Sequence, residues 1–300
     1  MNMVESFFSN QYAGRGDLFE GLEVWKDEQF RALQGTYPVI FLSFAGIKET
    51  TFKMTRHKIC QMLTEQYEKY QFLLSEDLLS ETEKDAFQRI DVNMNDADAS
   101  MALYHLSNYL YRFYGKKVLI LLDEYDTPMQ EAYVDRYWKE LVAFTRSLFN
   151  CTFKTNPYLE RGIMTGITRV SKESIFSDLN NLQVITTTSG KYETSFGFTE
   201  KEVWDALGWF GYSDQMDRVK FWYDGFCFGD RKDIYNPWSI TKFLDSGKFD
   251  NYWANTSSNS LVGKLIREGS PDTKEYMEDL LDGKTIETPL DEEIVFNQLD

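Results

Sequence analysis

The sequence predicts an α/β protein in which a layered domain with a mainly parallel sheet is followed by a smaller, mainly helical domain. An uninterrupted aliphatic run at 118–122 directly precedes the carboxylates Asp123 and Glu124. Such a run suits a strand that helices cover on both faces, as in parallel sheets. Strand and helix patterns alternate in the first part of the chain, as in layered α/β domains. Helical patterns and aromatic residues prevail later, so we predict domains at 1–190 and 191–300.

Each element of the first domain has a local signal. Apolar residues at helical spacing predict helices, and short apolar runs predict strands. In chain order we expect a helix at 1–9, a strand at 37–44, helices at 50–79 and 99–114, a strand at 116–122, a helix at 137–149, a strand at 159–167, a helix at 171–179 and a last strand at 183–188. Gly115 ends the helix before the aliphatic strand, and Ser171 can cap the helix that it begins.

Capping residues and turns define the second domain. Thr199 and Ser213 are expected to cap two helices, the second of which runs through Trp222. Glycine and aromatic residues at 222–229 predict a hairpin-like connection. The pairs Asn236-Pro237 and Ser270-Pro271 each predict a helix start, because a capping side chain precedes a proline that suits the first helical position. The last of these helices ends at Gly283.

Composition limits the classes of protein to consider. Three hundred residues with 42% hydrophobic content can bury a sizeable core. No apolar run reaches the roughly 18 residues of a membrane helix, and the first ten residues lack the features of a signal peptide, so we expect a cytoplasmic protein with no membrane association. Three scattered cysteines and two histidines support neither a disulfide framework nor a zinc site.

The charge balance argues against nucleic-acid binding. Forty-eight acidic and 32 basic residues give a net charge of −16, and no basic cluster interrupts the acidic composition. A protein of this charge repels a polyanion, so we expect no direct contact with nucleic acid. A metal ion and a few placed cations can still hold a phosphate locally.

The carboxylates after the aliphatic strand are the candidate catalytic group. Ligands of parallel sheets gather at the carboxyl ends of the strands, where Asp123 and Glu124 are expected to lie. In phosphoryl transfer Asp123 would hold magnesium, usually through water, and Glu124 would orient or deprotonate the attacking water. Four hydrophobic residues before Asp-Glu also occur by chance, so a purely structural strand end stays an alternative. Asp126, followed by Thr127 and Pro128, is expected to form a turn and a helix cap and not a third ligand.

Three residues at and beyond the end of the next predicted strand could sense a nucleotide. Arg169 follows that strand, where its guanidinium could reach a γ-phosphate. Thr165 and Thr168 could contact the same phosphate. The alternatives are a surface or interdomain salt bridge for Arg169, and ordinary strand positions for the threonines.

Seven motifs follow one another along the chain: LLDEYDTP at 121–128, LERG at 159–162, TGITRV at 165–170, KESIF at 172–176, FGFTE at 196–200, WYDG at 222–225 and YNPWS at 235–239. Together they resemble the bacterial predicted AAA-ATPase (AAA-ATPase-like) family over nearly the whole chain, from about Leu18 to Asp300. The resemblance implies a P-loop NTPase core that binds Mg²⁺ and ATP. It also implies that Asp123 and Glu124 are the Walker B pair and that Arg169 is in a sensor-like position. Members commonly continue into a C-terminal nuclease-like domain of the PD-(D/E)xK type.

The chain departs from the family at the phosphate-binding loop. The full pattern G-x-x-x-x-G-K-[ST] does not occur: Gly115-Lys116-Lys117 precedes a strand instead of a helix, and Gly14-Arg15-Gly16 lacks the lysine. We therefore expect this chain to be an incomplete piece of a longer ATPase that does not hydrolyse ATP by itself. The strand that feeds the loop lies inside the sheet of such folds, so its loss would leave two neighbouring strands with unpaired edges.

Other functional classes remain open. A non-catalytic module built on a decayed NTPase fold could bind a protein partner through Trp222, Tyr223, Trp238 and Trp253, although we expect these aromatic side chains to form the core of the second domain. A nuclease or phosphatase could use Asp123 with its neighbouring carboxylates as metal ligands, but no lysine follows at nuclease-like spacing. A Ser/His/Asp hydrolase lacks the G-x-S-x-G elbow.

Overall fold

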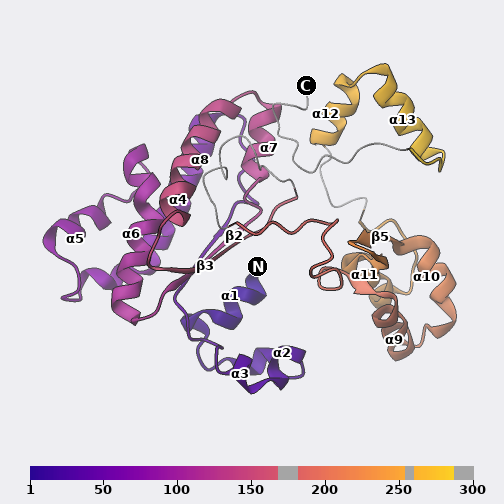
Figure 1. The fold of residues 1–300 in the computed structure, drawn as a ribbon, viewed down its shortest axis with the longest axis horizontal. Coiled ribbons are helices and arrows are strands. Elements are labelled where there is room, and N and C mark those ends of the chain that lie inside the picture. The colour runs from indigo at the N-terminus through magenta and orange to yellow at the C-terminus, as the bar shows by residue number, and fades with distance from the viewer. Residues whose placement is uncertain (168–181, 254–259, 287–300) are drawn as a thin grey trace. The chain divides into compact units, whose positions relative to one another are not determined.

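The computed structural model describes residues 1–167, 182–253 and 260–286. These residues divide into two compact units, one drawn from Met1–Asn180 with Leu261–Asp300 and the other from Asn181–Ser260 (Figure 1). The α/β class and the parallel sheet are confirmed. The domain boundary at residue 190 stays a prediction.

A three-stranded parallel sheet forms the centre of the first unit. Its strands are β1 (Val39–Ser43), β2 (Val118–Asp123) and β3 (Leu159–Met164), in the order β1-β2-β3. Ser43 of β1 lies opposite Asp123 of β2, so these two strands end at the same edge. Each strand lies within its predicted range, apart from one residue at the end of β2.

Helices cover both faces of this sheet (Figure 1). Helix α1 (Asn2–Phe8) packs on one face. Three longer helices pack on the other: α4 (Phe52–Lys69), α6 (Asp96–Tyr114) and α8 (Trp138–Phe153). The predicted helices at 1–9, 99–114 and 137–149 are therefore confirmed.

The two covered faces explain the aliphatic run in β2. Val118, Ile120 and Leu122 face the core with α4, α6 and α8, whereas Leu119 and Leu121 face α1. All five side chains are buried. Because successive side chains of a strand point to opposite faces, a strand with both faces covered needs apolar residues at every position.

The predicted helix at 50–79 is shorter than expected. Helix α4 ends at Lys69, and a short 3-10 helix at Gln71–Leu74 follows. Between them the buried Tyr70 hydroxyl donates a hydrogen bond to the backbone oxygen of Val39 at 2.9 Å. This tertiary contact accompanies a turn of the chain that helical periodicity alone does not indicate.

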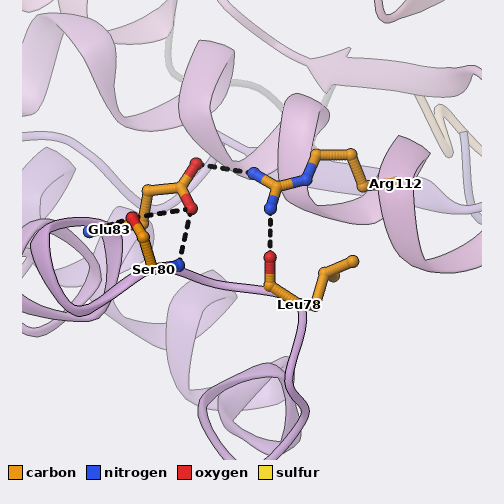
Figure 2. Close-up of polar contacts among 4 residues, drawn as sticks. All are labelled: Leu78, Ser80, Glu83 and Arg112. Atoms are coloured by element: carbon orange, nitrogen blue, oxygen red, sulfur yellow. Dashed lines mark hydrogen bonds and ion pairs between the residues drawn. The ribbon is translucent and has the colours of Figure 1, made fainter.

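A polar network joins the next helix, α5 (Glu81–Gln88), to α6 (Figure 2). The Ser80 hydroxyl accepts a hydrogen bond from the backbone N–H of Glu83, and the Glu83 carboxylate accepts one from the backbone N–H of Ser80. The same carboxylate accepts from Arg112 of α6 at 2.5 Å, and Arg112 also donates to the Leu78 carbonyl. Partial burial raises the pKa of Glu83, but the bonds from Arg112 and Ser80 outweigh it and leave the pKa lowered.

The remaining described helices of the first unit are α2 (Glu23–Lys26), α3 (Glu28–Arg31), α7 (Thr127–Val134), α12 (Ser260–Glu268) and α13 (Pro271–Leu281). Ser270 caps α13 as predicted, because its hydroxyl accepts from the backbone N–H of Thr273. No described helix is long and apolar enough to span a membrane.

The second unit combines helices with a small antiparallel sheet. Its strands β4 (Phe198–Thr199), β6 (Arg231–Tyr235) and β5 (Asp224–Phe228) lie side by side in that order, and its helices are α9 (Glu200–Phe210), α10 (Met216–Tyr223) and α11 (Pro237–Ser246). Strands β5 and β6 pair as a hairpin, but the predicted connection at 222–229 consists of the end of α10 and β5 itself. Thr199 and Asn236 cap α9 and α11 as predicted. Ser213 does not cap α10, because it begins a 3-10 turn and Gln215 occupies the cap position.

The aromatic residues of this unit divide between its core and its surface. Tyr223 is buried as predicted, but Trp222, Trp238 and Trp253 are exposed, so the prediction of a core position is wrong for these three. Neighbouring residues of a helix point about 100° apart, so in α10 Tyr223 can face the core of the second unit while Trp222 faces outward.

The predicted strand at 183–188 is wrong, since these residues form no strand. Leu182, Val184 and Ile185 are exposed. A strand needs a neighbour for its backbone hydrogen bonds, and no described strand pairs with this segment. The predicted helix at 171–179 lies outside the described residues.

Among the described strands, β1 and β3 are the two edges of the parallel sheet. Among the described residues β3 pairs only with β2, and its Glu160 and Arg161 are exposed. A three-stranded sheet has two edge strands in any case, so the expected loss of the strand that feeds the phosphate loop stays a prediction.

Candidate functional site

The ends of β2 and β3 bring together residues that are 42 positions apart in the sequence. The backbone N–H of Thr165 donates to the Leu122 carbonyl at 2.9 Å, and the N–H of Tyr125 donates to the Thr165 carbonyl at 3.1 Å. On the other side of β2, the N–H of Phe44 donates to the Asp123 carbonyl at 2.9 Å. Backbone pairing therefore continues past the end of the strand and fixes Asp123 beside Thr165.

Asp123 is partly buried and points one carboxylate oxygen at Thr165. The Thr165 hydroxyl donates to Asp123 Oδ1 at 2.5 Å. Within the described part of the chain, no residue donates a hydrogen bond to Asp123 Oδ2. The arrangement holds one oxygen and leaves the other available to a ligand.

Glu124 has an unusual backbone. Its φ is +50°, in the left-handed region that non-glycine residues rarely adopt, and its side chain is exposed. The Thr127 hydroxyl donates to Glu124 Oε2 at 3.2 Å. This conformation costs about 1–2 kcal/mol, and strain of this kind concentrates at functional sites.

Asp126 occupies the N-cap position of α7, as predicted, but its side chain makes no capping hydrogen bond. Its carboxylate instead accepts hydrogen bonds from the backbone N–H of Ile167 and from Gln130 Nε2, each at 3.1 Å. The predicted turn is present, since the N–H of Met129 donates to the Asp126 carbonyl at 3.0 Å. The bond to Ile167 spans two loops, which a local capping pattern does not indicate.

The donor set fits a magnesium ion better than a metal held by protein ligands alone. In residues 1–167, 182–253 and 260–286, no three His, Cys, Asp or Glu side chains gather as a metal cage. Magnesium usually keeps several waters and takes only one or two carboxylates together with substrate phosphates. One carboxylate with an available oxygen, as on Asp123, fits that requirement.

The phosphate end of a nucleotide has no matching loop here. Gly283-Lys284-Thr285 matches the end of the phosphate-loop motif, but Glu278 stands where the motif needs its first glycine. The tripeptide follows the end of α13 instead of leading from a strand into a helix. Lys284 is also paired with Asp279, at 2.6 Å. The sequence therefore contains no complete phosphate-loop motif beside the predicted Asp123 and Glu124 pair.

The residues predicted to sense a nucleotide are only partly described by the structure. Thr165 lies at the site, where its hydroxyl contacts Asp123. Thr168 and Arg169 lie outside the described residues. The contact between Thr165 and Asp123 was not predicted from the sequence, although a Thr-Gly pair directly after a strand is a signal for close backbone approach.

A second charged cluster lies in the other unit, where its ion pairs hold structural elements together. Lys220 of α10 donates to Glu200 at 2.7 Å and to Asp233 at 3.2 Å, and lies 3.8 Å from Asp224. These carboxylates hold the pKa of Lys220 above its usual value. Burial, with the neighbouring Asp233, raises the pKa of Asp224. The WYDG motif therefore contributes an ion pair that links α10 to the sheet.

Comparisons with known proteins bear on the family of the chain. The family described as Predicted AAA-ATPase matches residues 1–176, a segment that includes both β2 and β3. A curated protein of Azotobacter chroococcum mcd 1, described as an uncharacterized protein in the vnfD 5′ region, is 24% identical over 263 residues. This alignment covers 86% of the chain and 45% of that protein, so the chain spans less than half of its relative. No solved structure matches the chain. Because the family match covers more than half of its residues, the chain belongs to the predicted AAA-ATPase family.

Proposed function

We propose that the joined ends of β2 and β3 are the metal-and-water half of an Mg-ATP hydrolysis site. Asp123 holds Mg²⁺, mainly through water, and Glu124 orients or deprotonates the water that attacks the γ-phosphate. The observation that carries the proposal is the Asp123 carboxylate, which is anchored by Thr165 through one oxygen and open at the other. Membership of a predicted ATPase family supports the same function.

Hydrolysis requires a phosphate loop in addition to these residues. The bound Mg²⁺ would neutralise charge on the transferred phosphate, whereas the protein's own groups position the ion and the water. We therefore expect ATP hydrolysis in a longer form of the protein that carries the loop and not in this chain. In that form, Arg169 and Thr168 would sense the nucleotide, residues 191–300 would act as a lid, and a C-terminal nuclease-like domain could follow.

Nucleotide titration tests this function. The encoding DNA upstream of Met1 is read for an in-frame G-x-x-x-x-G-K-[ST] segment, and the extended protein is expressed beside the 300-residue chain. Mg-ATP binding is measured for both by calorimetry. We expect saturable binding by the extended protein and none by the shorter chain. If the extended protein also ignores Mg-ATP, the proposal is wrong.

A non-catalytic interaction module is the second candidate, and exposed aromatic side chains favour it. Trp209 of α9 is 91% exposed and Phe221 of α10 is 86% exposed, and Trp204 and Phe210 are also exposed. Large exposed aromatic side chains are typical of protein interaction sites. This candidate predicts that Trp209→Ala and Phe221→Ala abolish binding of a protein partner while Glu124→Gln leaves it unchanged. The ATPase candidate predicts that Glu124→Gln changes the nucleotide cycle.

A further inference from the structure

A buried carboxylate joins the loops that follow β2 and β3. Asp126 is 1% exposed, and its Oδ2 accepts the backbone N–H of Ile167 and the Gln130 side chain. Burial of a carboxylate is costly unless hydrogen bonds compensate it, so these contacts are strong constraints on the local backbone. The bond to Ile167 holds the loop after β3 against the turn after β2.

The glycine before Ile167 allows this approach. A Cβ atom on Gly166 would lie 2.5 Å from Asp126 Oδ1 and 3.0 Å from a ring carbon of Tyr125. The backbone of Gly166 is not in the left-handed region. A side chain at this position would therefore have to displace the Asp126 carboxylate, and the restriction comes from this contact and not from backbone conformation.

Thr165 links this contact to Asp123. It directly precedes Gly166, its carbonyl accepts the N–H of Tyr125, and its hydroxyl donates to Asp123 Oδ1 at 2.5 Å. Any shift of Gly166 and Ile167 therefore moves the hydroxyl that orients Asp123. Asp126, the residue after Tyr125, holds the same loop at a second point, because its carboxylate accepts the N–H of Ile167.

We propose that Asp126 is a positioning residue: it sets the direction of the Asp123 carboxylate through Ile167, Gly166 and Thr165, and it does not bind the metal itself. The proposal rests on the proposed function, in which Asp123 holds Mg²⁺. Magnesium requires near-ideal octahedral geometry, so a small rotation of its carboxylate ligand weakens binding. Replacing residues that orient a metal ligand typically costs about 10–100-fold in metal affinity or activity.

The contact itself is tested in the 300-residue chain by hydrogen exchange of the Ile167 amide. Asp126→Ala removes the acceptor and Gly166→Ala forces the carboxylate away, so both should speed exchange about ten-fold or more. Asp126→Asn keeps an acceptor oxygen and should exchange nearly as the wild type does. Gly46→Ala is the matched control, because a Cβ there meets no atom within 4 Å. Unchanged exchange in both Asp126→Ala and Gly166→Ala overturns the proposal.

The consequence for magnesium is tested in the extended protein that carries the phosphate loop. We measure the Mg²⁺ concentration for half-maximal ATP hydrolysis and the KM for ATP at saturating Mg²⁺. Asp126→Ala and Gly166→Ala should raise the Mg²⁺ requirement by about 10–100-fold with little change in KM, and Asp126→Asn should restore it. Gly46→Ala should match the wild type.

The outcomes separate the two proposals. An Asp126→Asn variant as impaired as Asp126→Ala would identify Asp126 as a metal ligand and overturn its positioning role. An unchanged Mg²⁺ requirement in Gly166→Ala, together with faster exchange at Ile167, also overturns that role. If the wild-type extended protein does not bind Mg-ATP, the proposed function fails, and the role of Asp126 in it fails too. Should Asp126→Ala not fold, Gly166→Ala and Asp126→Asn decide the question.

Discussion

At the scale of single residues, the site depends on conformations that are costly by themselves. Glu124 adopts a positive φ without being glycine, and Asp126 places a carboxylate in a buried position. Gly166 has no side chain, and this allows the loop after β3 to approach the turn after β2 closely. Each of these features lowers the stability of the fold or restricts which residues the position accepts. Such features are expected where local geometry serves a function.

Replacing Glu124 by glycine should stabilise the fold. Glycine adopts φ near +50° without the clash that an L side chain meets, so we expect Glu124→Gly to raise the free energy of unfolding by about 0.5–1 kcal/mol. Urea denaturation measures this change. Glu131→Gly, inside α7, is the matched control and should lower stability by about 1 kcal/mol. A loss of stability in Glu124→Gly would show that the side chain's contacts outweigh the strain.

His105 should make stability depend on pH. Burial lowers the pKa of His105, although Asp98 and Glu83 oppose this shift and Arg89 adds to it. The unfolded chain then binds a proton at a higher pH than the folded chain does, so stability is complete above pH ~6.5 and falls as the pH decreases below it.

The matching measurement is the free energy of unfolding at about pH 7 and pH 5. His105→Gln should show a smaller fall than the wild type over this range. His57→Gln, at the exposed second histidine, is the control. An equal fall in the wild type and in His105→Gln would contradict the burial effect.

At the scale of elements, prediction succeeded where a local signal and the tertiary structure agree. The aliphatic run of β2, the left-handed Gly115 after α6 and the capping side chain of Asn236 each specify their element almost alone. Prediction failed where a contact with a residue distant in the sequence determines whether an element forms or where it ends. Tyr70 ends α4 near β1, and the segment at 183–188 has strand composition but no described neighbour to pair with.

The buried position of β2 gives a quantitative prediction. Leu121 is fully buried on the face that α1 covers, so Leu121→Ala should cost about 2–5 kcal/mol of unfolding free energy. Leu281→Ala, at a side chain that is 83% exposed, should change stability by less than about 0.5 kcal/mol. Denaturant unfolding of both variants compares them directly. Equal effects would mean that α1 does not cover β2 in solution.

At the scale of the whole molecule, the sequence predicts the candidate half-site but not the contacts that organise it. Asp123 and Glu124 could be chosen from a strand pattern followed by carboxylates. Their connection to Thr165 and Asp126 could not, because it depends on the register between β2 and β3 and on a close approach at Gly166. Sequence patterns report local periodicity, whereas such contacts arise only when distant strands pair.

The unpaired outer edge of β3 leads to a prediction for a longer protein that carries the phosphate loop. Both β1 and β3 are edge strands, and the side chains of β3 are the more exposed, so we expect an added strand to pair with β3. We expect the amides of Leu159–Met164 that do not bond β2 to exchange more slowly in the extended protein than in this chain. Amides of β1 should be unaffected and serve as the internal control. Slower exchange at β1 and not at β3 would place the added strand at the wrong edge.

The central claim is that Asp123 and Glu124 form the metal-and-water half of an ATP hydrolysis site, and a single-turnover experiment tests it most directly. The extended protein and its Glu124→Gln variant are mixed with Mg-ATP, and the bound nucleotide is identified over time. We predict that the wild type converts ATP to ADP, whereas Glu124→Gln binds ATP and retains it unhydrolysed. Equal turnover by the two proteins would contradict the claim.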